Sequence, residues 1–271
     1  MSAPGSDSTP LGAVVLVGGR ARRMGGAAKH LLELGGSTPW DRTLAALAAH
    51  GISPIIAVGS APADGRLTDA AVGPAPADGR PADAAAVPVV TWVREDPPFG
   101  GPVAALAAAL SRPELDDAAE FLLLAGDLAH PEAVVARLAE KNPVVTDPAE
   151  TEAETEASLV ADCGSEPRRA AICDQRAEGQ RAHVPRPTDA VVFRAGEHPQ
   201  WLAGRYRVAA VRAALAAFGG VDGASCRAVL GGLPIRWLAD EDGITADIDT
   251  PADLERARAD AAGSAARSEE P

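Results

Sequence analysis

The stretch that decides the fold is AVVLVGGRARRMGGAAKHLLEL, residues 13–34. It joins an apolar run to a loop with two glycine pairs and three arginines, and it ends in a second apolar segment. An apolar strand followed by a glycine-rich loop is typical of a ligand site at the carboxyl end of a strand in an α/β protein. We therefore expect the first strand at residues 12–17 and a binding site directly after it.

The composition of this loop predicts that it binds phosphate. Glycine pairs at positions 18–19 and 25–26 let the backbone approach a ligand closely. The positive charge that a triphosphate needs is supplied by four side chains, Arg20, Arg22, Arg23 and Lys29. The alternative interpretation is a basic surface turn, in which the glycines give only flexibility.

Two familiar phosphate-binding loops do not fit. A P-loop ends in Gly-Lys-Ser/Thr, whereas Lys29 follows Ala28 and precedes His30. The dinucleotide fingerprint GxGxxG is also absent, because the glycines come as adjacent pairs separated by a basic segment.

The loop resembles the signature of the molybdenum cofactor guanylyltransferases and, more loosely, the wider nucleotidyltransferase pattern LAGGxSxRMGxxK. The matching positions are Leu16–Gly19, Arg23–Gly25 and Lys29. The resemblance implies that Arg23 and Lys29 are catalytic and that Arg22 and Arg23 neutralise a leaving pyrophosphate. It further implies nucleotide contacts from Leu16, Val17, Gly18, Gly19, Arg22, Lys29 and Asp96.

Length and composition fit one domain. The chain has 271 residues, 46% of them hydrophobic, which is enough for a single α/β domain, expected at residues 11–260. Low-complexity sequence predicts mobile insertions at about 61–88, where PADGR occurs twice, and at 147–187. Residues 1–10 and 261–271 are polar and are expected to be disordered.

The net charge of −13 argues against a nucleic-acid partner, although a local basic loop can still hold a small anion. No apolar run has the length of a membrane span, and the first ten residues do not resemble a signal peptide. We therefore expect a cytoplasmic protein with no membrane contact. The three cysteines lack CxxC spacing, which suggests neither a zinc site nor a disulfide framework.

Apolar strands alternate with alanine-rich helical segments, which predicts a three-layer α/β fold with a mostly parallel sheet, of the Rossmann-like nucleotidyltransferase type. Strands are expected at residues 54–59, 89–93 and 121–127 in addition to the first. Helices are expected at residues 39–50 and 103–110, and a third ends near residue 140. Gly100-Gly101-Pro102 opens the second helix, as it does in the family that the chain resembles.

Asp127 follows an apolar strand that is expected to be buried on both faces. Such a strand delivers its carboxyl end into the crevice of an open sheet, where a carboxylate can hold Mg2+ against a nucleotide phosphate. The resemblance implies the same catalytic, metal-binding and nucleotide-binding role for Asp127. The alternative is that this side chain caps the next helix, near Pro131.

A strand at 189–193, a turn and a returning strand at 200–206 predict a small β-hairpin extension. The resemblance implies that this hairpin covers the acceptor side of the site. His198, Gln200 and Arg205 are then candidate acceptor contacts, although each can also be an ordinary turn or surface residue.

The segment Asp247-Ile248-Asp249-Thr250-Pro251 matches the closing motif of the same family. Alternation along a short strand puts Asp247 and Asp249 on one face, where they can meet a cation. Thr250 is expected to cap the last helix, and Asp253 to complete that capping arrangement.

The motifs together predict an enzyme. The resemblance implies transfer of GMP from GTP to the phosphate of molybdopterin with release of pyrophosphate, with Mg2+ as cofactor and molybdoenzyme-maturation proteins as partners. Cytidylyl transfer, another phosphorylated acceptor, and a catalytically silent nucleotide-binding module stay open as alternatives.

Overall fold

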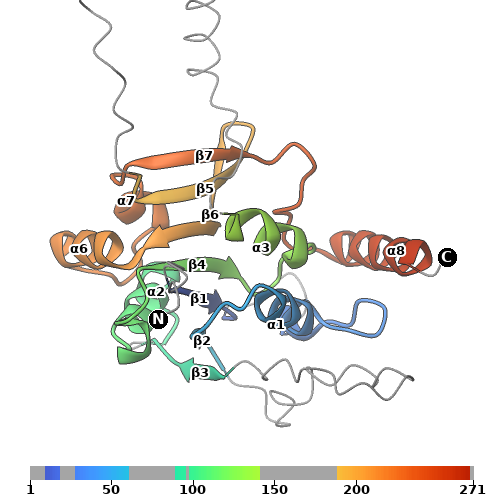
Figure 1. Cartoon of the computed structure of the whole chain (residues 1–271), viewed down its shortest axis with the longest axis horizontal. Helices are drawn as coiled ribbons and strands as arrows, with labels where there is room; N and C mark the ends of the chain where they lie inside the picture. Colours follow the sequence, from blue (N-terminus) through green and yellow to red (C-terminus); the bar gives the residue numbers. More distant parts are fainter. Residues whose placement is uncertain (1–9, 19–27, 61–88, 96–97, 141–187, 269–271) are drawn as a thin grey trace, which may run out of the picture.

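The computed structural model describes residues 10–18, 28–60, 89–95, 98–140 and 188–268 (Figure 1). The strands are β1 (Leu11–Leu16), β2 (Ile55–Val58), β3 (Val90–Val93), β4 (Glu120–Ala125), β5 (Ala190–Ala195), β6 (His198–Arg207) and β7 (Ile235–Ala239). The helices are α1 (Pro39–Ala49), α2 (Pro102–Leu110), α3 (Pro131–Ala139), α6 (Val208–Phe218), α7 (Cys226–Leu230) and α8 (Pro251–Ser268). Two short 3-10 helices are η2 (Lys29–Leu31) and η3 (Pro113–Leu115).

The described strands form one seven-stranded sheet in the order β3-β2-β1-β4-β6-β5-β7. The first four strands are mutually parallel, β6 runs antiparallel between β4 and β5, and β7 is parallel to β5. This arrangement confirms the predicted α/β class with a mostly parallel sheet.

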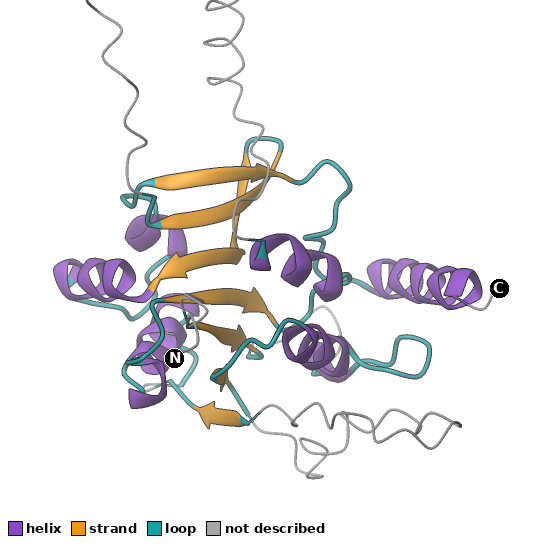
Figure 2. Cartoon of the chain, viewed as in Figure 1, coloured by secondary structure: helices purple, strands orange, loops and turns teal. Residues whose placement is uncertain are grey.

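Helices cover both faces of the sheet, as the layers in Figures 1 and 2 show. The helices α1 and α3 pack over one face, and α2, α6 and α7 pack over the other. Successive residues of β1 point alternately into the two cores, so that Val14 belongs to one and Val15 to the other. Both residues are fully buried, which explains the uninterrupted apolar run at this position.

The β5–β6 hairpin was expected as a small extension, but it is part of the main sheet. The strand β6 is ten residues long and pairs with β4 from Glu120 to Leu124. Burial explains this position, because Val192, Phe193 and Tyr206 are almost completely enclosed and need a layer on each face. The hairpin strands β6 and β5, together with β7, therefore extend the sheet by three strands beyond β4.

Several elements near the C-terminus differ from the sequence-based expectations. Helices α6 and α7 and strand β7 were not predicted. The helix α8 continues to Ser268, whereas the segment from residue 261 was expected to be disordered. The alanine-rich composition of this segment favours a helix, since alanine has the highest helix propensity.

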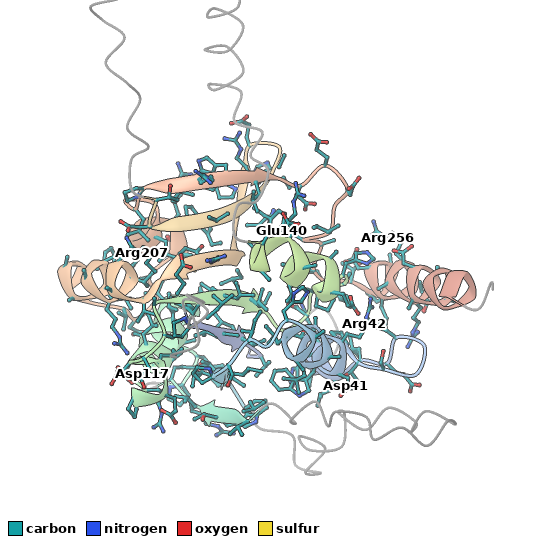
Figure 3. All side chains as sticks on the ribbon, viewed as in Figure 1. Asp41, Arg42, Asp117, Glu140, Arg207 and Arg256 are labelled. Carbon is teal, nitrogen blue, oxygen red and sulfur yellow. The ribbon has the colours of Figure 1, made fainter. Side chains whose placement is uncertain are left out.

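Ion pairs between helices supplement the apolar cores. Arg42 of α1, which is labelled in Figure 3, forms an ion pair with Glu132 of α3 and donates to the Ala129 carbonyl at 3.1 Å. Among the described residues, no helix is both long enough and apolar enough to span a membrane.

Candidate active site

Three charged side chains from distant parts of the sequence meet beyond the carboxyl end of β4. The Lys29 ammonium donates a hydrogen bond to Asp127 Oδ2 at 3.1 Å and forms a second ion pair with Asp249 Oδ1. The lysine opens η2, and Asp127 follows β4 by two residues. The structure therefore brings together three of the residues predicted from the sequence.

Close backbone packing around Val17 fixes the position of Asp127. The Gly126 amide donates to the Leu16 carbonyl at 2.9 Å, which ties the end of β4 to the end of β1. A Cβ at Gly126 would lie 2.8 Å from Val17 Cγ1 and 3.0 Å from the Leu16 carbonyl oxygen. On the other side, Gly59 has φ +147° and its added Cβ would lie 2.9 Å from Val17 Cγ2. Only glycines allow the strand ends to approach this closely.

The residue after Lys29 anchors it. His30 is buried, with 7% of its surface exposed, and its ring packs edge-on against Trp40 with centroids 6.5 Å apart. Burial lowers the pKa of His30 against the opposing effect of Asp127, so the ring favours its neutral form. A neutral anchor in the core leaves Lys29 as the cation facing the carboxylates.

The carboxylates of Asp247 and Asp249 are carried by an extended segment beside the end of β4. The Ala129 amide donates to the Ala246 carbonyl at 2.9 Å, and the Ile248 amide donates to the Asp127 carbonyl at 2.9 Å. Ile248 is fully buried, whereas Asp249 is exposed. Asp247 is exposed as a whole residue, but its carboxyl group lies in a pocket, where it loses part of its hydration. The predicted short strand is reduced to a single bridge of Asp247 with Leu128; Asp249 reaches Lys29, and Asp247 lines a pocket.

Two further aspartates hold the ends of this segment. Asp240 accepts hydrogen bonds from the Ile244 amide at 2.8 Å, the Thr245 amide at 3.1 Å and the Thr245 hydroxyl. Asp253 accepts from the Thr250 amide at 2.8 Å and from the Asp249 amide at 3.2 Å. The Asp253 amide donates to the Thr250 hydroxyl at 3.3 Å, which confirms the predicted capping arrangement.

The charges of this cluster act on one another. Loss of hydration and the negative charges of Asp127 and Asp249 raise the pKa of Asp247 to about 7. Partial burial lowers the pKa of Lys29, but hydrogen bonds to Asp249 and Asp127 outweigh this effect and the net shift is upward. Lys29 therefore remains charged and partly neutralises an excess of carboxylates.

The donor chemistry of this cluster fits a magnesium ion shared with a substrate. Among the described residues, no group of three or more His, Cys, Asp or Glu side chains lies close enough to hold a metal ion by itself. Mg2+ is usually bound by one or two carboxylates, with substrate phosphates and water completing its octahedral shell. Asp127 and Asp249, which share one lysine, can supply these two carboxylates.

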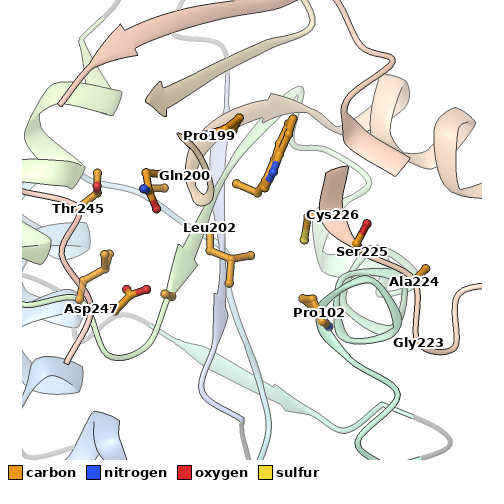
Figure 4. A pocket seen from close by; sticks show the side chains of 14 residues that line it. Pro102, Pro199, Gln200, Leu202, Gly223, Ala224, Ser225, Cys226, Thr245 and Asp247 are labelled. Carbon is orange, nitrogen blue, oxygen red and sulfur yellow. The ribbon is translucent and has the colours of Figure 1, made fainter. Parts of the chain in front are cut away.

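A pocket of about 500 Å³ opens next to the carboxylates (Figure 4). In Figure 4, Thr245, Gln200 and Asp247 gather on one side, while Pro102, Ser225 and Cys226 lie on the other. The described lining residues are Pro102, Ala125, Leu128, Pro199–Ala203, Gly223–Cys226, Thr245 and Asp247. Gln200 and Asp247 were predicted from the sequence, whereas the wall formed by the start of α7 was not.

The candidate acceptor contacts lie in different places. Gln200 lines the pocket, whereas His198 is exposed at the start of β6, next to the lining residue Pro199. Arg205 does not belong to this site. It forms an ion pair with Glu120, the first residue of β4, and donates to the carbonyls of Leu138 and Glu140. Glu120 marks the amino end of the parallel strand, opposite to Asp127.

The remaining predicted nucleotide contacts are only partly described. Leu16 and Val17 are buried in the sheet, so only their backbone can face a ligand, and Gly18 is exposed at the end of β1. A Cβ at Gly18 would meet no atom closer than 3.9 Å, which leaves room for a ligand near this backbone. Gly19, Arg22, Arg23 and Asp96 lie outside the described residues.

The fold and the site fit a nucleotide-dependent α/β transferase, because a lysine and two carboxylates from distant segments meet at the carboxyl edge of the parallel strands. The chain belongs to the MobA-like NTP transferase domain family, whose sequence profile matches residues 13–234. Among curated proteins, no sequence matches the chain significantly.

Solved structures show the same fold at low sequence identity. A nucleotidyl transferase from Methanothermobacter thermautotrophicus is 17% identical, with a TM-score of 0.55 over 95% of this chain and 100% of that chain. A homologue of Mycobacterium tuberculosis Rv0371c from Mycobacterium sp. strain JC1 is 18% identical, with a TM-score of 0.53 over 93% and 97% of the two chains. These likenesses establish the fold of the chain and leave its substrates open.

Proposed function

We propose that this chain is a magnesium-dependent nucleotidyltransferase that moves GMP from GTP to the phosphate of molybdopterin and releases pyrophosphate. The observation that carries the catalytic part of this proposal is the contact of Lys29 with both Asp127 and Asp249. The family supports NTP transfer. The choice of guanine nucleotide and of a pterin acceptor rests on the resemblance of the loop and of the closing motif to the molybdenum cofactor guanylyltransferases.

The reaction is an in-line displacement at the α-phosphorus of the triphosphate. An oxygen of the acceptor phosphate forms a new P–O bond, the bond between the α-phosphorus and its bridging oxygen breaks, and pyrophosphate leaves with that oxygen. Such reactions need positioning and neutralisation of charge more than covalent participation of the protein. The described cluster offers both.

Each residue has a defined task in this scheme. The Lys29 ammonium binds a phosphate oxygen of the triphosphate and neutralises charge that develops on the leaving group. Asp127 and Asp249 would hold Mg2+, with Asp247 as a further carboxylate nearby. When bound, Mg2+ supplies positive charge to the phosphates and orients them. Arg22 and Arg23 would act on the pyrophosphate, and Asp96 on the nucleotide.

The pocket is the proposed acceptor side of the site. Gln200 lines the pocket, and His198 directly precedes the lining residue Pro199 in the sequence. Both therefore remain proposed acceptor contacts. The pocket volume of about 500 Å³ falls within the usual range for small-molecule sites. Asp247 lines the pocket and forms a β-bridge with Leu128, the residue that follows Asp127, so we place the acceptor phosphate at this end of the pocket.

The experiment that tests this proposal follows pyrophosphate release from GTP, CTP, ATP and UTP, each with molybdopterin and Mg2+. We expect release with GTP that depends on metal and acceptor and is abolished in Asp127→Ala. Release with CTP but with none of the other three triphosphates would contradict guanylyl transfer and identify the chain as a cytidylyltransferase. Binding of GTP without turnover on any phosphorylated acceptor would contradict the enzymatic proposal and identify a nucleotide-binding module.

A further inference from the structure

A third, small apolar core lies apart from the two that flank the sheet. It contains five buried residues: Leu34, Ala129, Ile248, Leu254 and Ala257. The last two belong to α8, which begins beside the segments that precede α1 and α3 and then extends away from the sheet (Figure 1). The first three come from the segments that carry the three charged residues of the site. This third core therefore connects one helix with all three parts of the site.

The two carboxylates stand next to residues of the third core. Ile248 directly precedes Asp249, and Ala129 is separated from Asp127 by Leu128 alone. The Ile248 amide donates to the Asp127 carbonyl at 2.9 Å, which joins the two segments. Packing that fixes Ile248 and Ala129 therefore also fixes the backbone on which the carboxylates stand.

The segment that carries Lys29 is attached to α8 by a hydrogen bond as well as by packing. Arg258 Nε donates to the Glu33 carbonyl at 3.1 Å, directly before the buried Leu34. Glu255, one turn earlier in α8, accepts from Arg258 Nη1 at 2.9 Å and so orients the guanidinium. The lysine itself lies in a 3-10 helix of three residues, which has little rigidity of its own. Contacts beyond that helix must therefore hold Lys29 in place.

The segment that carries Asp127 has a second link to α8. His130 ends this segment as the N-cap residue of α3, and its Nε2 atom lies 3.5 Å from Asp260 Oδ2. In the first turn of α8, Asp253 accepts from the Asp249 amide at 3.2 Å. Successive turns of one helix therefore contact all three segments of the site.

Close packing suits these contacts to a positioning role. Protein interiors are packed as densely as organic crystals and resist deformation. Displacement of a reacting group by about 1 Å can cost about 10²-fold in rate. Both Leu254 and Ala257 are buried. A side chain removed from the third core should therefore shift the charged residues relative to one another, as well as loosen α8.

From these contacts we infer that the third core positions the charges of the active site, with Leu254, Ala257 and Arg258 of α8 as positioning residues. They act through the backbone of the three segments and hold Lys29 at the distance from the two carboxylates that nucleotide and metal require. This inference rests on the proposed function, because it takes the charged cluster as the site of the triphosphate and Mg2+. It goes further by assigning a role in the reaction to the C-terminal helix.

A matched pair of leucine variants separates positioning from stability. Leu254→Ala removes packing from the third core. Leu115→Ala removes the same atoms from a fully buried position in η3, before the amino end of β4. At a temperature at which both proteins are folded, we expect Leu254→Ala to lower kcat/KM for pyrophosphate release by about 10- to 100-fold. Leu115→Ala should leave this rate unchanged.

Nucleotide binding gives a readout that does not need turnover. The dissociation constant is measured by calorimetry for a GTP analogue with a non-cleavable methylene between the α- and β-phosphorus, in the presence of Mg2+. Leu254→Ala should weaken this binding by about tenfold, and Leu115→Ala should not weaken it. Equal effects of the two variants on both rate and binding would overturn the inference.

The hydrogen bond from α8 to the lysine segment is tested separately. Arg258→Met should raise the same dissociation constant by about three- to tenfold, and Arg258→Lys, which keeps a donor, should lie between this variant and the wild type. Arg137→Met is the matched control and should bind as the wild type does. Its side chain is 42% exposed against 44% for Arg258, and each arginine pairs with a glutamate one turn away.

A double-mutant cycle identifies the route of the effect. In the Lys29→Met background, Arg258→Met should cause no further loss of binding, because its effect passes through Lys29. The same loss in both backgrounds would contradict a positioning role for Arg258. If Leu254→Ala fails to fold, the arginine variants alone decide.

Failure of the inference and failure of the proposed function give different results. A protein that transfers nucleotide, but in which Leu254→Ala behaves like Leu115→Ala, refutes the inference and retains the function. A protein that binds the analogue, loses affinity in Leu254→Ala and never releases pyrophosphate refutes the function and retains the positioning role. A wild-type protein that does not bind the analogue refutes both.

Discussion

The Lys29 ammonium lies 3.1 Å from Asp127 Oδ2, although 98 positions separate the two residues in the sequence. Both side chains are about one-fifth exposed, so the pair lies at a surface that a ligand can reach. Asp249 completes the contact from a third part of the chain. When an anionic substrate arrives together with its own cation, the ammonium can pair with the substrate and the two carboxylates can pair with the incoming cation. A cation placed between two carboxylates is therefore suited to such a substrate.

Replacement of Lys29 tests this exchange. Lys29→Met keeps the length of the side chain and removes its charge, and we expect kcat/KM for pyrophosphate release to fall by about 10²–10³-fold. Unfolding stability should change by less than about 1 kcal/mol, because partly exposed ion pairs contribute little. The measurement is a coupled pyrophosphate assay beside a denaturant melt. Arg137→Met, at a partly exposed position on α3, is the control, and equal rates in both variants would refute a role for Lys29.

We expect Asp240 to contribute to activity only by positioning other residues. It accepts from two backbone amides and one hydroxyl at the start of the segment that carries Asp247 and Asp249. Asp240→Ala should therefore reduce kcat/KM by about 10- to 100-fold through misplacement of these carboxylates. It should also cost about 1–3 kcal/mol of stability.

A metal titration identifies this positioning role. The Mg2+ concentration that gives half-maximal rate should rise in Asp240→Ala, and Asp240→Asn, which keeps one acceptor oxygen, should fall between this variant and the wild type. Asp242→Ala lies in the same loop, is exposed and should behave as the wild type. A loss of stability without any change in metal dependence would show that Asp240 has a structural role only.

The core of the site could be predicted because local patterns suffice for it. Strands β1 and β4 are recognisable by their apolar residues, and parallel strands place their carboxyl ends at one edge. Asp127 follows from that geometry, whereas Lys29 and Asp249 were predicted from the resemblance of the loop and of the closing motif to the molybdenum cofactor guanylyltransferases. Alternation with a period of two then placed Asp247 and Asp249 on one face, with Ile248 buried between them.

Other parts of the site depend on contacts that no local pattern contains. The pairing of β6 with β4 decides that Arg205 lies at the amino end of β4 beside Glu120, away from the pocket that Gln200 lines. The wall at Ser225 and Cys226 similarly requires the packing of α7 against the sheet. Asp240 had a recognisable signal, an aspartate that precedes a glycine-containing turn and can accept from nearby amides, but its role depends on where that turn lies.

The corrected position of Arg205 leads to a separate prediction. Arg205→Met leaves Glu120 without its cation and removes donors from the carbonyls of Leu138 and Glu140. We expect stability to fall by about 1–3 kcal/mol, while KM for the acceptor stays unchanged. Gln200→Ala should do the opposite: raise the acceptor KM and leave the denaturation midpoint nearly unaltered. Denaturant melts and acceptor titrations on both variants check this, and a raised acceptor KM in a stable Arg205→Met protein would restore Arg205 to the site.

The carboxylate cluster should make stability depend on pH. The pKa of Asp247 is about 7, above its ordinary value of 3.8, mainly because of lost hydration and then because of Asp127 and Asp249. The folded protein therefore binds the proton of Asp247 more tightly than the unfolded chain does, and stability falls as pH rises from about 4 to about 7. Asp247→Asn removes this titration. In EDTA, its melting temperature should exceed that of the wild type at pH 8, and the difference should vanish near pH 4. Added Mg2+ should reduce this difference in melting temperature at pH 8, since a bound cation also relieves the repulsion between the carboxylates. A difference that stays constant across this range would contradict the raised pKa of Asp247.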